Sequence, residues 1–193
     1  MPDEVLKQIN WVDIFIVTLL LRVYYVSFKN GLYAEFFKCM GTLAAAYLGL
    51  HYYTLLTNFL VNSLKLKSIP LEFLDFLTFL FLVLLGYGLF ALLRQTFTHF
   101  FKIQVAGHIS QWGGLLVGIL RGFLLTSLIT YILVISSVAY LRNSAHTSYL
   151  GRGLFKIAPS TYSWLWNNIL SKINAGEEFN KTVTEVENSF YKT

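Results

Sequence analysis

The chain has 193 residues, of which 55% are hydrophobic and only 13% are charged, and its mean hydropathy is +0.57. This small number of charged side chains cannot cover the surface of a water-soluble globule. The composition therefore excludes a soluble protein and predicts that a lipid bilayer surrounds the chain. The net charge of +5 comes from 15 scattered Lys and Arg residues without a basic stripe, so nucleic acid is not an expected partner.

Four apolar segments follow one another within residues 1–145, and each is near the roughly 20 residues that a spanning helix needs. They predict an all-α, integral membrane four-helix bundle with helices over residues 11–28, 36–60, 76–93 and 112–141. Lys29, Asn30 and Gly31 separate the first two segments, and we expect a tight turn there. Glycine at the end of this group suits a helix C-cap or a sharp reversal of the chain.

The chain becomes more polar after the fourth segment. Residues 146–176 mix Trp164, Trp166 and Ile169 with Asn, Ser and Lys, which predicts an amphipathic helix lying on the membrane surface. A helix that caps the bundle outside the lipid is an equally acceptable interpretation of this pattern. Residues 177–193 are short and polar with dispersed charge, which favours a mobile polar tail.

Small residues recur at four-residue spacing in two of the apolar segments, and residues at this spacing share one face of a helix. Such a face lets another backbone approach closely. The predicted helix-packing residues are Gly114, Gly118 and Gly122 in the fourth segment and Gly41, Ala45 and Gly49 in the second. The partner of the first set is either a helix of the same chain or a helix of a second copy or another membrane protein.

Charged residues inside the apolar segments form the second predicted feature. Four antiparallel crossings bring Arg22, Glu35 and Arg121 toward the same side of the membrane. An unpaired arginine in lipid costs roughly 2.5 kcal/mol or more, so we expect Arg121 to meet Glu35, with Arg22 or Lys38 sharing the carboxylate. The alternative is that Arg121 extends to the headgroups without a partner.

Enzyme chemistry is not expected from this sequence. It contains no nucleotide-binding loop, zinc-protease helix or nucleophile elbow, and its four histidines lack ligand spacing. The single cysteine, Cys39, excludes an intrachain disulfide. We therefore expect no catalytic residue, metal or cofactor. A small channel or transporter subunit, with a polar path near Arg121, Glu35 and His51, is the alternative to a structural or accessory role.

Several motifs occur in a characteristic order along residues 10–160. They are Trp11-Val12-Asp13, Asn30-Gly31-Leu32-Tyr33-Ala34-Glu35, His51-Tyr52-Tyr53, Gly114-x-x-x-Gly118-x-x-Arg121-Gly122, and the segment from Leu154 to Pro159. In this order the chain resembles the colicin V production protein (CvpA) family. It departs from the family pattern at Asn30, where arginine is usual, and at Ser110-Gln111, where an Asp-Arg pair is typical.

The resemblance implies a function and a location. It implies a non-enzymatic, multi-pass protein of the bacterial inner (cytoplasmic) membrane, linked to colicin V (toxin) production or export and to envelope homeostasis. Such a protein would act as a structural or accessory partner of another membrane protein or as a homo-oligomer.

Overall fold

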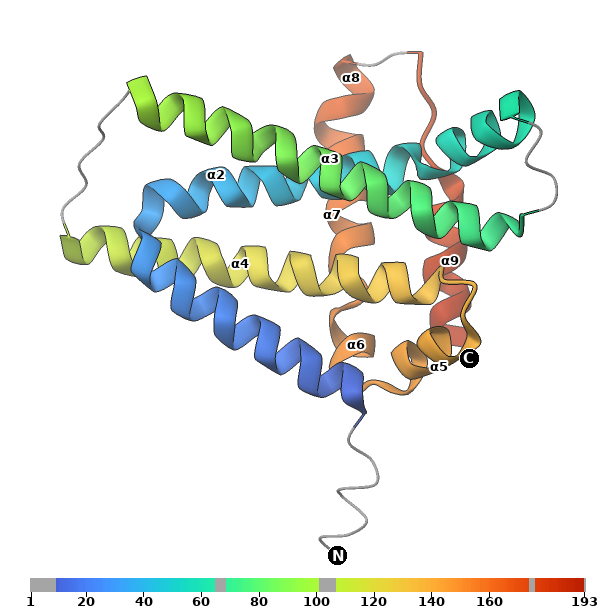
Figure 1. The fold of residues 1–193 in the computed structure, drawn as a ribbon, viewed down its shortest axis with the longest axis horizontal. Helices are drawn as coiled ribbons and strands as arrows, with labels where there is room; N and C mark the ends of the chain where they lie inside the picture. The colour runs from blue at the N-terminus through green and yellow to red at the C-terminus, as the bar shows by residue number, and fades with distance from the viewer. Residues whose placement is uncertain (1–9, 65–68, 101–106, 174–175, 193) are drawn as a thin grey trace, which may run out of the picture.

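A computed structural model describes residues 10–64, 69–100, 107–173 and 176–192, and all regular structure within these ranges is helical. Figure 1 shows three long helices and a group of short ones that pack against them. The long helices are α2 (Trp11–Leu64), α3 (Leu71–Phe100) and α4 (Gly107–Val134). The short ones are α5 (Ala139–Thr147), α6 (Tyr149–Leu154), α7 (Ile157–Leu165), the π-helical η1 (Trp166–Leu170), α8 (Ser171–Ile173) and α9 (Lys181–Lys192).

The three long helices are apolar enough to cross a membrane, over Trp11–Ser63, Leu71–Thr96 and Gly107–Val134. Helix α2 has 54 residues and would be about 80 Å long if straight, far more than the roughly 30 Å of a hydrocarbon core. It is broken at Gly31, whose φ of 76° and ψ of 173° lie outside the helical region. The segments expected over 11–28 and 36–60 are therefore two arms of one broken helix, residues 11–30 and 32–64, without a loop between them.

Helix α2 organises the packing of the other long helices. Its two arms diverge from the break, with α4 lying between them and α3 crossing the second arm (Figure 1). Helices α3 and α4 make few contacts with each other. In the 18-residue apolar stretch by which each helix qualifies as a span, 56% of the residues of α4 are buried, against 22% in α2 and 22% in α3. Helix α4 is therefore the central helix, and much of α2 and α3 remains available to lipid or to a partner.

The glycine face of α4 lies against the break and the first arm of α2. Gly114, Gly118 and Gly122 are all buried. A Cβ atom added at Gly114 would stand 2.6 Å from the carbonyl carbon of Gly31, and one at Gly122 would stand 3.1 Å from the ring of Tyr24. A Cβ atom at Gly118 would overlap the Ser27 side chain. Of the two partners expected for these glycines, the structure shows a helix of the same chain, α2.

The second set of small residues faces α3. A Cβ atom added at Gly41 would stand 3.0 Å from Phe90, and one at Gly49 would stand 2.7 Å from Val83. Between them, Ala45 lies beside Gly86 of α3, where an added Cβ atom would stand 2.9 Å from the Cα atom of Ala45. The second arm of α2 and α3 therefore approach each other through small residues on both helices.

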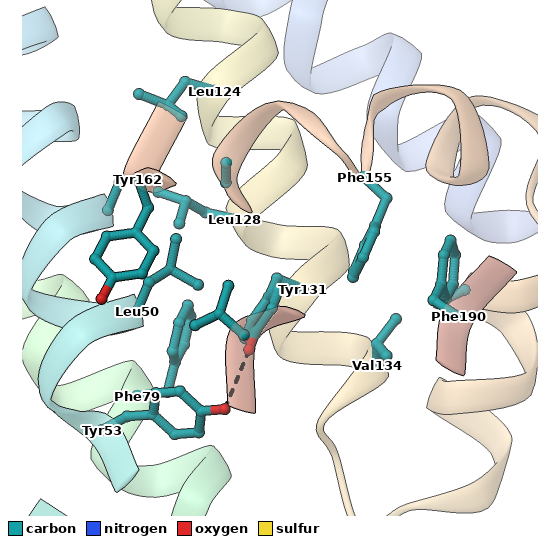
Figure 2. Close-up of a cluster of buried hydrophobic side chains, with 14 residues drawn as sticks. Leu50, Tyr53, Phe79, Leu124, Leu128, Tyr131, Val134, Phe155, Tyr162 and Phe190 are labelled. Carbon is teal, nitrogen blue, oxygen red and sulfur yellow. Dashed lines mark hydrogen bonds between the residues drawn. The ribbon is translucent and has the colours of Figure 1, made fainter. Parts of the chain in front are cut away.

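An aromatic core joins these helices to the C-terminal elements (Figure 2). The buried ring of Tyr131 in α4 stacks on Phe79 of α3 at 5.2 Å and on Phe155 at 5.8 Å between ring centroids. Its hydroxyl lies 3.1 Å from that of Tyr53. Phe155 stacks in turn on Phe190 of α9 at 4.2 Å. The C-terminal elements are thus part of the same core as the long helices.

Two expectations about residues after the fourth segment need correction. Helix α4 ends at Val134, so the segment expected to run to residue 141 is shorter and α5 begins separately at Ala139. Residues 177–193, expected as a mobile polar tail, contain α9, whose Val183 and Phe190 are buried. Val183, Val186 and Phe190 are spaced by three and four positions, which gives this short polar helix one apolar face.

The expected amphipathic helix over residues 146–176 is a succession of short helices. Trp164 is exposed, whereas Trp166 is buried against the ring of His51, so the two tryptophans do not share one exposed face. Residues 174–175, like residues 1–9 of the predicted transmembrane domain and residue 193 of the tail, lie outside the described residues.

Candidate functional site

A buried carboxylate lies between α2 and α4: that of Glu35, one turn after the break in α2. Glu35 is fully buried and accepts four polar contacts. The Arg121 guanidinium lies 2.8 Å from its Oε2 atom, and the Lys38 ammonium lies 2.6 Å from Oε1. The Ser27 hydroxyl donates to Oε2 at 2.9 Å, and the Asn30 amide donates to Oε1 at 3.2 Å. We call these five residues the buried charge cluster after its buried members Ser27, Glu35 and Arg121; Lys38 is partly buried and Asn30 is exposed.

The break at Gly31 places the cluster. A φ of 76° is strained for a residue with a side chain, and it turns the second arm so that Ser27 and Glu35 face each other across the break. A break also leaves N–H groups at the start of the second arm without helical partners. The Ser110 hydroxyl of α4 accepts a hydrogen bond from the Leu32 N–H at 3.2 Å. The chain therefore satisfies the broken backbone with the same helix that supplies the arginine.

Arg121 reaches Glu35 because α4 lies close to α2 at this point. Gly118, one turn before Arg121, has no side chain, and the Ser27 hydroxyl occupies that space. Arg121 is 5% exposed, so its charge is removed from lipid and from water alike. Its Nε atom has no hydrogen-bond partner among the described residues, while its Nη2 atom faces Glu35 and Ser27. The close approach of the backbones and the ion pair thus depend on each other.

The structure brings Glu35 and Arg121 together but does not add Arg22 to them. Arg22 is exposed on the first arm and forms no ion pair in the part of the chain that the structure describes. Lys38 occupies the second cationic position, because it follows Glu35 by three residues on the same arm and so shares its face. The cluster contains two cations and one carboxylate, which leaves an excess of positive charge.

His51 belongs to a separate cluster further along the second arm. Its Nδ1 atom lies 2.8 Å from the Tyr162 hydroxyl, and its Nε2 atom lies 3.0 Å from Oε2 of Glu177. The ring lies between those of Tyr47 and Trp166, with centroid distances of 5.2 and 4.9 Å. His51 follows Glu35 by 16 positions, about 24 Å along a helix axis. The two clusters therefore do not converge on one site.

The residues around His51 fix the C-terminal segment to α2. Asn180 donates from its side chain to the Leu50 carbonyl at 2.7 Å and from its backbone to the Tyr162 hydroxyl at 3.0 Å. Burial raises the pKa of Tyr162 to about 12, so this hydroxyl stays protonated and can act as both donor and acceptor. Sequence reasoning missed Tyr162, Glu177 and Asn180, because they lie more than 100 positions from His51 in the chain.

A third polar contact, also missed, joins the start of α2 to α6. The Asp13 carboxylate accepts hydrogen bonds from the Ser148 hydroxyl at 2.7 Å and from the Leu150 N–H at 2.8 Å. Ser148 in turn caps α6 by accepting a hydrogen bond from the Gly151 N–H. An acidic group at a helix N-terminus is favourable because the free N–H groups there carry partial positive charge.

The chemistry available to these clusters is limited. The Glu35 carboxylate is already bonded to two cations and two neutral donors. Within residues 10–64, 69–100, 107–173 and 176–192, no three His, Cys, Asp or Glu side chains are arranged to hold a metal ion. Once these charges are buried, separating Arg121 from Glu35 would leave an uncompensated charge, so arrangements of the helices that keep them together are favoured over those that part them. The cluster is thus a packing centre in which α4 is fixed to the break in α2.

Comparisons with known proteins give one match. The model of the family described as colicin V production protein matches residues 12–159. No curated protein and no solved structure is similar to the chain at a significant level. The match begins at the start of α2 and ends in α7, so it contains the break at Gly31, the glycine face of α4 and every residue of the buried charge cluster. The three apolar helices and this match confirm the resemblance: the chain is a multi-pass membrane protein that belongs to the colicin V production protein family.

Proposed function

We propose that this protein is a non-enzymatic component of the bacterial inner membrane that supports colicin V production or export, and with it envelope homeostasis, as a structural or accessory partner. The observation that carries the proposal is the burial of Glu35 and Arg121 at the centre of the charge cluster. Glu35 is 0% exposed and is neutralised by side chains of its own chain, so the ionic groups serve helix packing. The colicin V production family is not a known enzyme family.

The proposal includes four membrane crossings, two of them made by the arms of α2. The first arm, residues 11–30, is about 30 Å long, and the second arm is longer. Each is long enough for a hydrocarbon core of about 30 Å. The large apolar side chains exposed on the first arm and on α3, such as Leu21 and Leu84, would face lipid or a partner.

Photocrosslinking in native membranes tests the partner role. A photoreactive amino acid at Leu21, Leu84 or Leu120, which are 64%, 62% and 67% exposed, should yield a discrete crosslinked product from at least one helix face. The matched control is the same amino acid at Leu50, which is fully buried and should crosslink only within the chain. Crosslinks to lipid alone from all three exposed positions would contradict a partner role.

The alternative is a small channel or transporter subunit with a polar path through Arg121, Glu35 and His51. The geometry gives this alternative less support, because His51 lies in its own cluster with Tyr162 and Glu177. Ion flux into liposomes that contain the purified chain separates the two functions. An accessory protein should give no flux above empty liposomes. Flux that disappears in Glu35→Gln, with the variant still folded, would favour the channel.

A further inference from the structure

A groove between the second arm of α2 and the C-terminal half of α3 has no role in the packing described above. It has a volume of about 580 Å³ and is lined by Ala34 of α2 and by Gly88, Ala91, Leu92, Arg94 and Gln95 of α3. A second hollow of about 100 Å³ shares Ala91 and Arg94 with it and reaches Lys38. In Figure 1 this is where the C-terminal end of α3 lies, on the same side as the break in α2.

The groove combines an apolar floor with a basic end. A Cβ atom added at Gly88 would meet nothing within 4 Å, so the floor is open at this point. Arg94 lies near the end of the candidate span Leu71–Thr96, the depth at which side chains meet phospholipid headgroups. Arg94 forms no ion pair with any residue that the structure describes. A cationic side chain therefore lies at headgroup depth beside the apolar floor of the groove.

The buried charge cluster adds to the positive potential at this end of the groove. Lys38 lines the smaller hollow together with Arg94, and its ammonium is bonded to Glu35. Because Glu35 is shared with Arg121, its single negative charge does not neutralise both cations. An excess positive charge therefore lies behind Arg94, and an anion in the groove would be attracted by both.

We propose that this groove binds an anionic phospholipid of the surrounding bilayer. The phosphate group contacts the Arg94 guanidinium, which presents paired donors suited to phosphate oxygens. One acyl chain lies over Gly88 and beside Leu92. A zwitterionic lipid carries a positive group that this end of the groove disfavours, so the site selects headgroups of net negative charge. The inference does not depend on the proposed function, because lipid binding beside Arg94 requires no protein partner.

Native mass spectrometry of the full chain in detergent tests the site, with dioleoylphosphatidylglycerol and dioleoylphosphatidylcholine as the two probes. The wild-type chain should retain phosphatidylglycerol about fivefold better than phosphatidylcholine, the effect expected of one basic residue at headgroup depth. Arg94→Gln should remove this preference and Arg94→Lys should keep most of it. Arg22→Gln is the control, because Arg22 is likewise an arginine within a span that forms no ion pair among the described residues, but it does not line the groove.

A second variant separates lipid from other occupants. Gly88→Leu places a side chain where an added Cβ atom meets nothing within 4 Å, and it should keep the melting temperature while reducing retention of phosphatidylglycerol. Equal retention of the two lipids by the wild-type chain would overturn the proposal, as would an equal loss in Arg94→Gln and Arg22→Gln. A lipid-independent dimer that Gly88→Leu dissociates would also overturn it, because a second copy would then occupy the groove.

Discussion

Replacing Gly114 by alanine tests whether bare backbone sets the distance between α4 and the break in α2. The new methyl group would stand 2.6 Å from the carbonyl carbon of Gly31 and 2.8 Å from the carbonyl oxygen of Ser27. Carbon atoms in normal contact are about 3.5–4.0 Å apart, so the shortfall is about 1 Å. Both neighbours are main-chain atoms, which cannot rotate away as a side chain can. The two helices must therefore separate at this point.

The size of the effect follows from two opposing terms. Forcing an extra methyl group into a packed contact costs about 1–3 kcal/mol. Exchanging glycine for alanine inside a helix gains about 1 kcal/mol, which hides part of this cost. Gly88→Ala is the matched control, since it makes the same exchange in a helix where the added Cβ atom meets nothing within 4 Å. The difference between the two variants isolates the steric term.

The assay is reversible unfolding of the purified full chain in detergent micelles. We expect Gly114→Ala to be less stable than Gly88→Ala by about 1–3 kcal/mol. Gly113→Ala should fall between them, because its Cβ atom would stand 3.3 Å from the flexible side chain of Leu32. If Gly114→Ala is as stable as Gly88→Ala, close approach at the break does not hold the helices together and the reasoning is refuted.

Three further predictions concern the charge cluster and the C-terminal elements. Glu35→Gln leaves the buried Arg121 and the partly buried Lys38 without a counter-charge and should lower the free energy of unfolding by about 3–5 kcal/mol. Lys38→Gln should lower it by less, and equal losses in the two variants would contradict this. Phe190→Ala removes a fully buried ring, so it should lower the free energy of unfolding by about 3–5 kcal/mol and speed hydrogen exchange in α9. Thr184→Ala, at an exposed position of the same helix, should change neither quantity. Burial, helped by two nearby arginines, lowers the pKa of His146 below 6.5, so the unfolded chain takes up this proton first. The contribution of His146 to the free energy of unfolding is therefore complete above about pH 6.5 and is lost as the pH falls below it. In unfolding measured from about pH 7.5 to about pH 5, His146→Gln should make the free energy of unfolding fall less steeply with decreasing pH.

The features that could be predicted from sequence are those with a local pattern or a large membrane cost. Gly114, Gly118 and Gly122 share a face because four-residue spacing does so in any helix, and here that face is buried against α2. Arg121 required a carboxylate because lipid cannot solvate it, and Glu35 was the nearest acid on the expected side. Both inferences needed only the helix period and the order of the crossings.

The features that were missed depend on three-dimensional contacts. The composition around Gly31 predicted a turn, but a single residue with positive φ breaks α2 while helix continues on both sides. Lys38 lies on the same arm as Glu35, whereas Arg22 lies on the first arm. Whether Arg22 also reaches Glu35 depends on how the break rotates the first arm about its axis, and the sequence does not give that rotation. The last residues looked like a tail because α9 is short and mostly polar. The spacing of Val183, Val186 and Phe190 gives it an apolar face, but the ring on which that face packs, Phe155, lies far away in the sequence.

The break, the glycine face and the ion pair are best understood as parts of one arrangement. A straight α2 would hold Ser27 and Glu35 about 12 Å apart along its axis, so the carboxylate would lose one of its donors. A bulky residue at position 118 would displace the Ser27 hydroxyl and move α4 outward, and Arg121 would no longer reach Glu35 at 2.8 Å. Loss of Glu35 would in turn leave Arg121 and Lys38 as uncompensated charges in the packed region. Each part is therefore favourable only when the other two are present, which explains how so few polar residues can specify one packing of these helices.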